Sequence, residues 1–125
     1  MTLVLDSGAL IALARGGRPM WTRMKAAQLT GDVPLTHAGV LGQVWRSVPR
    51  QARLAQALQG IDVRPIDERL GRAAGALLGE AGLADVIDAA LVLLATDGDD
   101  IVTSDPGDLS RLAAASGLHV ELIRP

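Results

Sequence analysis

The chain has 125 residues, enough for one domain with its own core, and its formal net charge is −2. The absence of cysteine excludes a disulfide framework, a thiolate nucleophile and any cysteine-based metal site. Because Phe and Tyr are absent and only two Trp are present, the core must be built from Leu, Val, Ile and Ala.

Nothing in the sequence predicts a membrane segment or an export signal. The apolar stretch 3–14 is interrupted by Asp6 and lacks a basic leader, and no apolar run reaches the roughly 18 residues that a membrane helix needs. Together with the lack of cysteine, this predicts a soluble, unprocessed protein of the cytoplasm that contacts no membrane.

The first half of the chain predicts two units in which a strand is followed at once by a helix. The first strand pattern runs into Asp6 and Ser7, which supply helix-capping chemistry. Thr36 can cap the helix after the second strand, and Pro49 forces that helix to end. The predicted elements are a strand at 2–5, a helix at 8–14, a helix at about 21–29, a strand at 33–36 and a helix from 36 that stops before 49.

The second half contains the clearest helix pattern. Its apolar residues recur at helical spacing between the cap Asp67 and Gly82. Gly71, Gly75 and Gly79 lie four residues apart and predict close approach of another backbone, either a neighbouring helix of the same chain or a second subunit. The predicted elements are a helix at 51–58, a strand at 61–66, a helix at 67–81, a helix at 84–96, a strand at 101–103, a helix from 106 and a strand at 119–123.

This order of strands and helices predicts an α/β fold, a three-layer α/β/α sandwich on a central parallel sheet, in a single domain over residues 1–125. Open sheets of this kind bind ligands beyond the carboxyl ends of their strands. Asp6 and Asp105 each follow a strand, and Asp85 and Asp88 share one face of a helix. We expect these four carboxylates to meet at one edge of the sheet.

Four converging carboxylates indicate a bound cation. They repel one another unless they are protonated or neutralised, and Mg²⁺ or Mn²⁺ suits ligation by oxygen alone. The alternative is that each of these acids only caps a helix, with Asp85 and Asp105 as the clearest cap positions. Capping does not explain why Asp6 continues a buried strand or why Asp88 stands in an apolar helix, so the combined pattern favours a metal site.

Charge is divided unevenly along the chain. Residues 1–64 contain eight Lys or Arg and three acids, whereas residues 65–125 contain four Lys or Arg and eleven acids. A basic region beside an acidic cluster is what a metal-dependent enzyme acting on a polyanion needs. The alternative is that helical surfaces simply carry unequal numbers of salt-bridge partners.

Three segments resemble the PIN-domain ribonucleases, most closely the VapC-type toxins of prokaryotic toxin–antitoxin pairs. Segment 3–10 is similar to the family's opening, segment 88–92 to its third acidic motif and segment 102–105 to its fourth. The resemblance implies a parallel sheet flanked by helices, metal-dependent cleavage of RNA, a VapB-type antitoxin that covers the acidic site, and a homodimer. The family's second acidic position aligns with Gln43, whose amide carries no charge, so metal affinity should fall.

Each residue of the predicted site has an expected task in phosphodiester hydrolysis. The metal would lower the pKa of a bound water, and Asp85 or Asp88 would accept the proton of that water. The expected metal ligands are Asp6, Asp88 and Asp105. Supporting contacts to the ligands or to a metal-bound water are expected from Ser7, Gln43 and Thr103.

Basic side chains near the predicted site are candidates for holding RNA phosphates, with a solvated helix face or antitoxin contacts as alternatives. The candidates are Arg15, Arg18, Arg46, Arg50 and Arg53. The near-absence of aromatic residues argues against extensive base stacking. His37 and His119 are expected to be structural, because a paired-histidine ribonuclease would need them adjacent.

Two other classes of function remain as alternatives. The chain could be a PIN-like module that has lost catalysis through Gln43 and binds RNA or a protein. It could also be a phosphotransfer domain with an acidic pocket, but no Asp-x-Asp follows the first strand and the only lysine, Lys25, does not follow a late strand.

Overall fold

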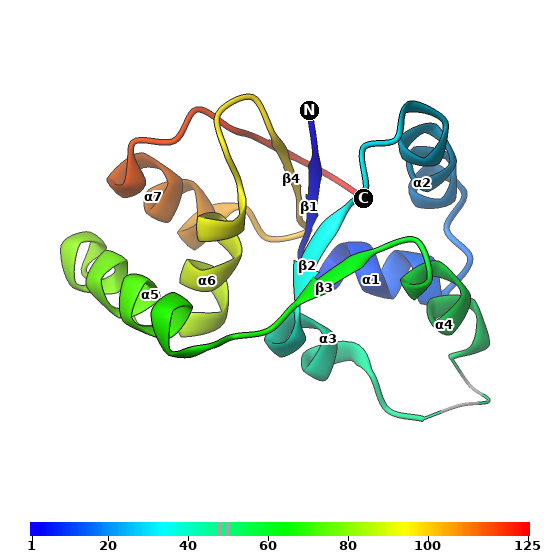
Figure 1. Ribbon diagram of the computed structural model, residues 1–125, viewed down its shortest axis with the longest axis horizontal. Coiled ribbons are helices and arrows are strands. Elements are labelled where there is room, and N and C mark those ends of the chain that lie inside the picture. The colour runs from blue at the N-terminus through cyan, green and yellow to red at the C-terminus, as the bar shows by residue number, and fades with distance from the viewer. Residues whose placement is uncertain (48, 50) are drawn as a thin grey trace.

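Five strands form one parallel sheet in the computed structural model, which describes residues 1–47, 49 and 51–125 (Figure 1). The order of the strands in space is β3-β2-β1-β4-β5. Because the order reverses on the two sides of β1, the carboxyl edge between β1 and β4 is the topological switch point at which α/β sheets bind ligands. The strands are β1 (Leu3–Leu5), β2 (Leu35–His37), β3 (Asp62–Arg64), β4 (Asp100–Val102) and β5 (Glu121–Ile123).

The register of the two central strands determines which residues meet at this edge. Leu5 of β1 is paired with Val102 of β4. The next residues, Asp6 and Thr103, therefore leave the sheet side by side, and the Asp6 N–H donates a hydrogen bond to the Val102 carbonyl at 3.0 Å. Pairing of β1 with β4 thus brings together two segments that lie about a hundred residues apart in the sequence.

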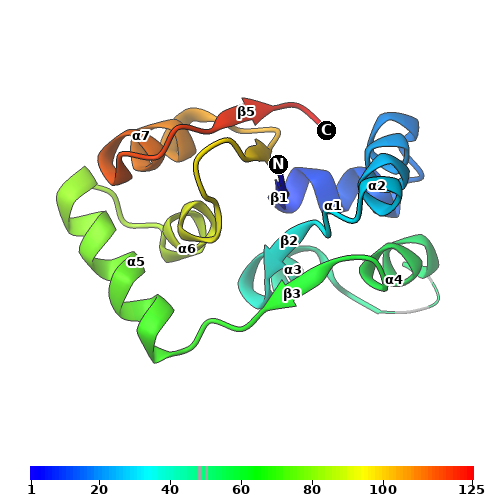
Figure 2. The same ribbon diagram turned by 45° about the horizontal axis from the view of Figure 1, so that its top comes forward.

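Helices cover both faces of the sheet, which confirms the predicted three-layer arrangement. Figure 2 shows α5, α6 and α7 on one side of the strands and α1, α2 and α4 on the other. Within the described part of the chain, no helix is long and apolar enough to cross a membrane. The helices are α1 (Ser7–Ala14), α2 (Arg18–Thr30), α3 (Ala38–Val44), α4 (Ala52–Leu58), α5 (Glu68–Ala81), α6 (Val86–Leu94) and α7 (Gly107–Ser116).

Local sequence explains why the helices of one layer form where they do. Asp67 caps α5 by accepting a hydrogen bond from the Leu70 N–H at 2.9 Å, and Gly82 ends the helix in the left-handed conformation, as predicted. Helix α6 is buried against the sheet through four residues that expose none of their surface: Ala89, Ala90, Leu91 and Val92. The amphipathic α5 then packs on α6 and α7.

Two details differ from the sequence-based predictions. Thr36 does not cap α3, because β2 continues through His37; the Thr36 hydroxyl donates instead to the Leu5 carbonyl at 2.8 Å, and His37 is the cap. The predicted packing of another helix of the same chain on the glycines of α5 is also wrong. A Cβ added at Gly71, Gly75 or Gly79 would meet no other atom within 4 Å, because α5 contacts its neighbours through a different face.

Candidate active site

Asp6 is fixed at the carboxyl end of β1 by hydrogen bonds to both of its side-chain oxygens. Its Oδ1 accepts from the backbone N–H of Ser7 at 2.7 Å, and its Oδ2 accepts from the hydroxyl of Thr103 at 2.7 Å. Only 8% of its surface is exposed. Each carboxylate oxygen can accept a second bond, so Asp6 remains able to bind a ligand from a position that is already set.

Thr103 connects two of the predicted carboxylate positions. Its hydroxyl is buried, donates to Asp6 Oδ2 and accepts from the backbone N–H of Asp105 at 3.0 Å. One oxygen therefore holds the side chain of Asp6 and the backbone of Asp105 in a fixed relation. Ser7 contributes its backbone N–H to the same arrangement.

Helix capping accounts for some of these acids but not for all of them. Asp85 is the cap of α6, because its Oδ1 accepts from the N–H groups of Ile87 at 2.9 Å and Asp88 at 3.3 Å. Asp6 caps α1 in addition to its bond with Thr103. The capping alternative for Asp105 is wrong, because α7 begins after Pro106 without a side-chain cap. Asp105 is exposed, and its carboxylate is left for another role.

Asp88 is the point at which the acids converge. Its pKa is raised from 3.8 to about 6, first by burial and then by the negative charges of Asp85, Asp6, Asp108 and Asp105, in that order of importance. Asp85, Asp6 and Asp105 therefore all lie within electrostatic reach of Asp88. Asp108, which the sequence analysis did not select as a site residue, joins them from the first turn of α7.

His37 ties the helix that carries Asp88 to the end of β2. Its Nδ1 accepts hydrogen bonds from the N–H groups of Gly39 at 3.0 Å and Val40 at 3.3 Å. The proton must then be on Nε2, which donates to the Ile87 carbonyl at 2.9 Å. His37 is structural, as expected, and its contact fixes the residue next to Asp88. The side chain of His119 is 90% exposed and lies 3.7 Å from Asp97.

An open hollow of about 670 Å³ lies beside Asp6 and Asp105. The loop after β4 forms one of its walls and packs directly on α1 at Gly8. A Cβ at Gly8 would overlap the Ser104 hydroxyl and come within 2.9 Å of the Ser104 Cβ. Glycine at this position therefore allows the loop that carries Asp105 to approach Asp6, a role that the sequence analysis missed.

The predicted RNA-binding arginines are distributed over several places. Arg15 lines the hollow, whereas Arg18 lines a separate groove between α2 and α4. The Arg46 guanidinium turns back on α3 and donates to the Trp45 carbonyl at 2.7 Å. Arg53 donates to the Arg15 carbonyl at 3.5 Å. Arg50 lies outside the described residues.

Two further observations concern the composition of the site. Arg124, which the sequence analysis did not select, follows β5 and lines the hollow together with Arg15. Strand β5 pairs with β4, so knowledge of the strand order would have pointed to Arg124.

Gln43 is exposed on α3, a helix that contacts α6.

The acids fit a hard divalent cation in donor type and in charge. All of them offer carboxylate oxygen, and burial together with the charges of the neighbouring acids raises the pKa of Asp88. Across residues 1–47, 49 and 51–125, however, no three His, Cys, Asp or Glu side chains are close enough together to hold an ion. The carboxylates share one edge of the sheet, but they would have to draw together around a cation.

Comparisons with known proteins establish the fold and nothing finer. No protein-family model matches the chain, and no curated protein matches its sequence. Among solved structures, it is similar to a chain in the crystal structure of VapBC2 from Rickettsia felis bound to a DNA fragment from their promoter. The TM-score is 0.70 at 15% sequence identity, over 98% of each chain. The PIN-like α/β fold predicted from the sequence is thereby confirmed.

Proposed function

We propose that the protein is a metal-dependent endoribonuclease of the VapC toxin type. The observation that carries this proposal is the gathering of carboxylates around Asp88 at the switch point of the sheet, beside a hollow lined by Arg15 and Arg124. Carboxylates that bind a metal and cations that bind phosphates are the two requirements for hydrolysis of a polyanion. The structural likeness to a chain of VapBC2 supports the same assignment.

In this proposal Asp6, Asp88 and Asp105 hold Mg²⁺ or Mn²⁺. The bound ion supplies the acidity that activates a water and the charge that balances the phosphoryl oxygens. Thr103 keeps Asp6 in position, and Asp6 needs no rearrangement of its own hydrogen bonds to act as a ligand. Because Oδ1 of Asp85 is occupied by backbone N–H groups, its Oδ2 is the atom that accepts the proton of the attacking water.

The arginines of the hollow hold the substrate. Arg15 and Arg124 are exposed and line the same cavity as Asp6 and Asp105. A guanidinium can bind a phosphate through two parallel hydrogen bonds, which orients the phosphate as well as attracting it. The scissile phosphate then lies between the cations and the acidic edge of the sheet.

We further propose that a small VapB-type antitoxin covers this hollow and that two copies of the chain associate as a homodimer in the cytoplasm. The similar structure is a VapBC2 assembly bound to promoter DNA, which supports a protein partner. An antitoxin would silence the nuclease by occupying the hollow that the RNA needs. Co-expression with a candidate antitoxin, followed by RNA cleavage assays on the purified complex, tests this regulation.

The nuclease proposal is tested with purified protein and a labelled RNA in Mg²⁺, in Mn²⁺ and in EDTA. Cleavage should require the divalent ion and should disappear in Asp6→Asn and Asp105→Asn. Glu80→Gln, which removes an exposed charge on α5 away from the site, is the matched control and should cleave normally. Absence of cleavage with every divalent ion would contradict the proposal.

A second candidate function is a PIN-like module that binds RNA or a protein without cutting. The neutral Gln43 and the absence of a ready three-ligand group among the described side chains favour it. Tight binding of RNA without cleavage, together with cleavage restored by Gln43→Glu, would identify the native protein as this module.

A further inference from the structure

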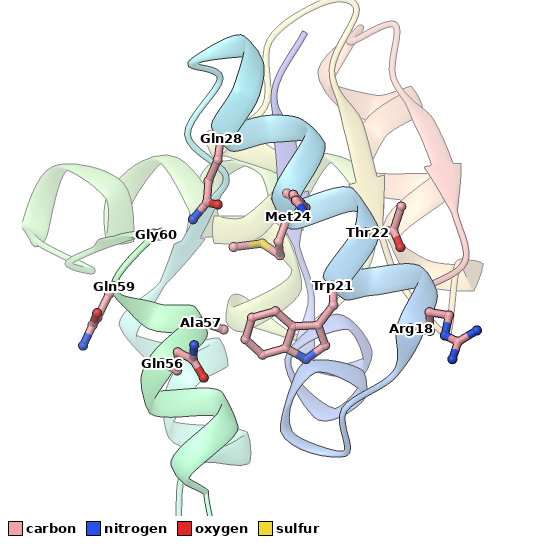
Figure 3. A pocket seen from close by; sticks show the side chains of 10 residues that line it. Arg18, Trp21, Thr22, Met24, Gln28, Gln56, Ala57, Gln59 and Gly60 are labelled. Atoms are coloured by element: carbon pink, nitrogen blue, oxygen red, sulfur yellow. The ribbon is translucent and has the colours of Figure 1, made fainter.

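A second hollow of about 660 Å³ lies between α2 and α4, outside the acidic site (Figure 3). Arg18, Trp21 and Lys25 line it from α2, and Gln56 lines it from α4. Gln28 and Gln59 add two more amides. We call this the α2–α4 groove. Packing of the fold does not require two cations and three amides on one open surface.

The charge of the groove is positive and uncompensated. No Asp or Glu is among the described residues that line it. Neither Arg18 nor Lys25 forms a salt bridge with any residue in the described part of the chain. Since opposite charges on the chain do not neutralise them, the natural occupant of the groove is an anion.

The remaining side chains have the chemistry that binds nucleobases. Each glutamine amide carries both donors and an acceptor, as the edges of bases do. The indole N–H of Trp21 donates to the Leu13 carbonyl at 3.1 Å, which holds the ring in one orientation. In Figure 3 this ring extends from α2 toward α4, beside Ala57. One half-buried aromatic ring is enough to stack a single base.

Three arginines connect the groove to the acidic hollow. Arg15 lines the hollow and Arg18 lines the groove, and the loop between them joins α1 to α2. The Arg53 guanidinium lies against this loop: it donates to the Arg15 carbonyl at 3.5 Å and would be 3.0 Å from a Cβ at Gly16. We call Arg15, Arg53 and Arg18 the arginine ridge. A polyanion that extends from the hollow toward the groove would pass Arg15, Arg53 and Arg18 in turn.

We propose that the α2–α4 groove binds the single-stranded RNA on one side of the scissile phosphate. The phosphates of this flank lie on the arginine ridge and on Lys25, and one base stacks on Trp21 while the amides of the groove contact its edge. The inference rests on the nuclease function proposed above and adds to it the substrate class, an unpaired RNA that extends several nucleotides beyond the cut. It also assigns base preference on that flank to the groove.

Binding measurements test the groove separately from catalysis. Arg18→Ala/Lys25→Ala is made in an Asp6→Asn protein, and the anisotropy of a labelled 20-nucleotide unpaired RNA is followed between low and moderate salt. Two phosphate contacts should disappear, so affinity at low salt should fall at least tenfold, and the slope of log affinity against log salt should decrease in magnitude by about 1.4. Arg69→Ala/Arg72→Ala removes the same charge from the exposed face of α5 and should leave both quantities unchanged.

Trp21 gives a second readout that does not depend on activity. In a Trp45→Phe protein Trp21 is the only tryptophan, and the unpaired RNA should quench its fluorescence. The quenching should disappear in Arg18→Ala/Lys25→Ala. A double-stranded RNA of the same sequence should not quench, because its bases are already stacked and paired.

The outcomes separate the two proposals. Cleavage of RNA by the native chain, with affinity, salt slope and quenching unchanged by Arg18→Ala/Lys25→Ala, would overturn the groove and leave the nuclease intact. Quenching and a reduced slope without cleavage would support the groove and remove the nuclease. If an Asp/Glu-rich 15-residue peptide quenches Trp21 and the unpaired RNA does not, the groove is a protein-docking surface and the RNA proposal is wrong.

Discussion

Replacing Asp88 by Asn should stabilise the metal-free protein at neutral and alkaline pH. The pKa of Asp88 is raised from 3.8 to about 6, first by burial and then by the charges of Asp85, Asp6, Asp108 and Asp105. A carboxyl group whose pKa is raised on folding favours the folded state when it is protonated. Its contribution is complete below about pH 4 and is lost as the pH rises through 6.

The size of the effect follows from the same pKa difference. At roughly 1.4 kcal/mol for each pKa unit, it corresponds to about 3 kcal/mol. Because Asp88 is only half-buried, solvent screens part of this, and we expect about 1–2 kcal/mol. Asn keeps the shape of the side chain without the charge, so the variant should be more stable than the native chain by that amount at pH 8 in EDTA.

Urea unfolding at pH 4 and at pH 8, with and without Mg²⁺, measures this effect. The two proteins should differ little at pH 4, and Mg²⁺ should stabilise the native chain at pH 8 far more than the variant. Glu80→Gln serves as the control for loss of an exposed charge. Equal stability of Asp88→Asn and the native chain at pH 8, or a less stable variant, would show that burial and neighbouring negative charge do not raise the pKa of Asp88.

Three further predictions concern the groups that position the acids. Gly8→Ala should cost about 1–3 kcal/mol of stability by overpacking and should reduce RNA cleavage in fully folded protein, whereas Gly42→Ala, which adds a Cβ in open space on α3, should do neither. His37→Asn retains a capping side chain but loses the bond to α6, so Mg²⁺ affinity, measured by calorimetry, should fall severalfold. Gln43→Glu should raise Mg²⁺ affinity and cleavage rate in the same assays; if neither changes, Gln43 does not belong to the site.

The acids at the strand ends could be found from the sequence because their position follows from local patterns. A short apolar strand ends at Asp6 and another ends shortly before Asp105, and parallel strands place such residues at one edge. Helical spacing likewise placed Asp85 and Asp88 together at the start of α6. These inferences needed only the periods of helix and strand.

The remaining features depend on contacts that local patterns do not encode. Arg124 reaches the hollow because β5 pairs with β4, and this strand order is a property of the whole sheet. Gly8 matters because the Ser104 loop crosses it, and a glycine in an apolar helix start gives no sign of that partner. Arg46 has a long, flexible side chain that folds back on its own helix, so its sequence position did not reveal where its charge lies.

The pairing of β1 with β4 also determines when Asp6 can first be held in position during synthesis of the chain. The Thr103 hydroxyl that holds Asp6 is 97 residues further along the chain. A ribosome must therefore synthesise the chain past residue 103 before Asp6 acquires this partner and β1 acquires β4 as its second neighbour. Under the proposed nuclease function, a nascent chain that has not yet reached β4 would lack a positioned Asp6 and would not cleave the RNA around it.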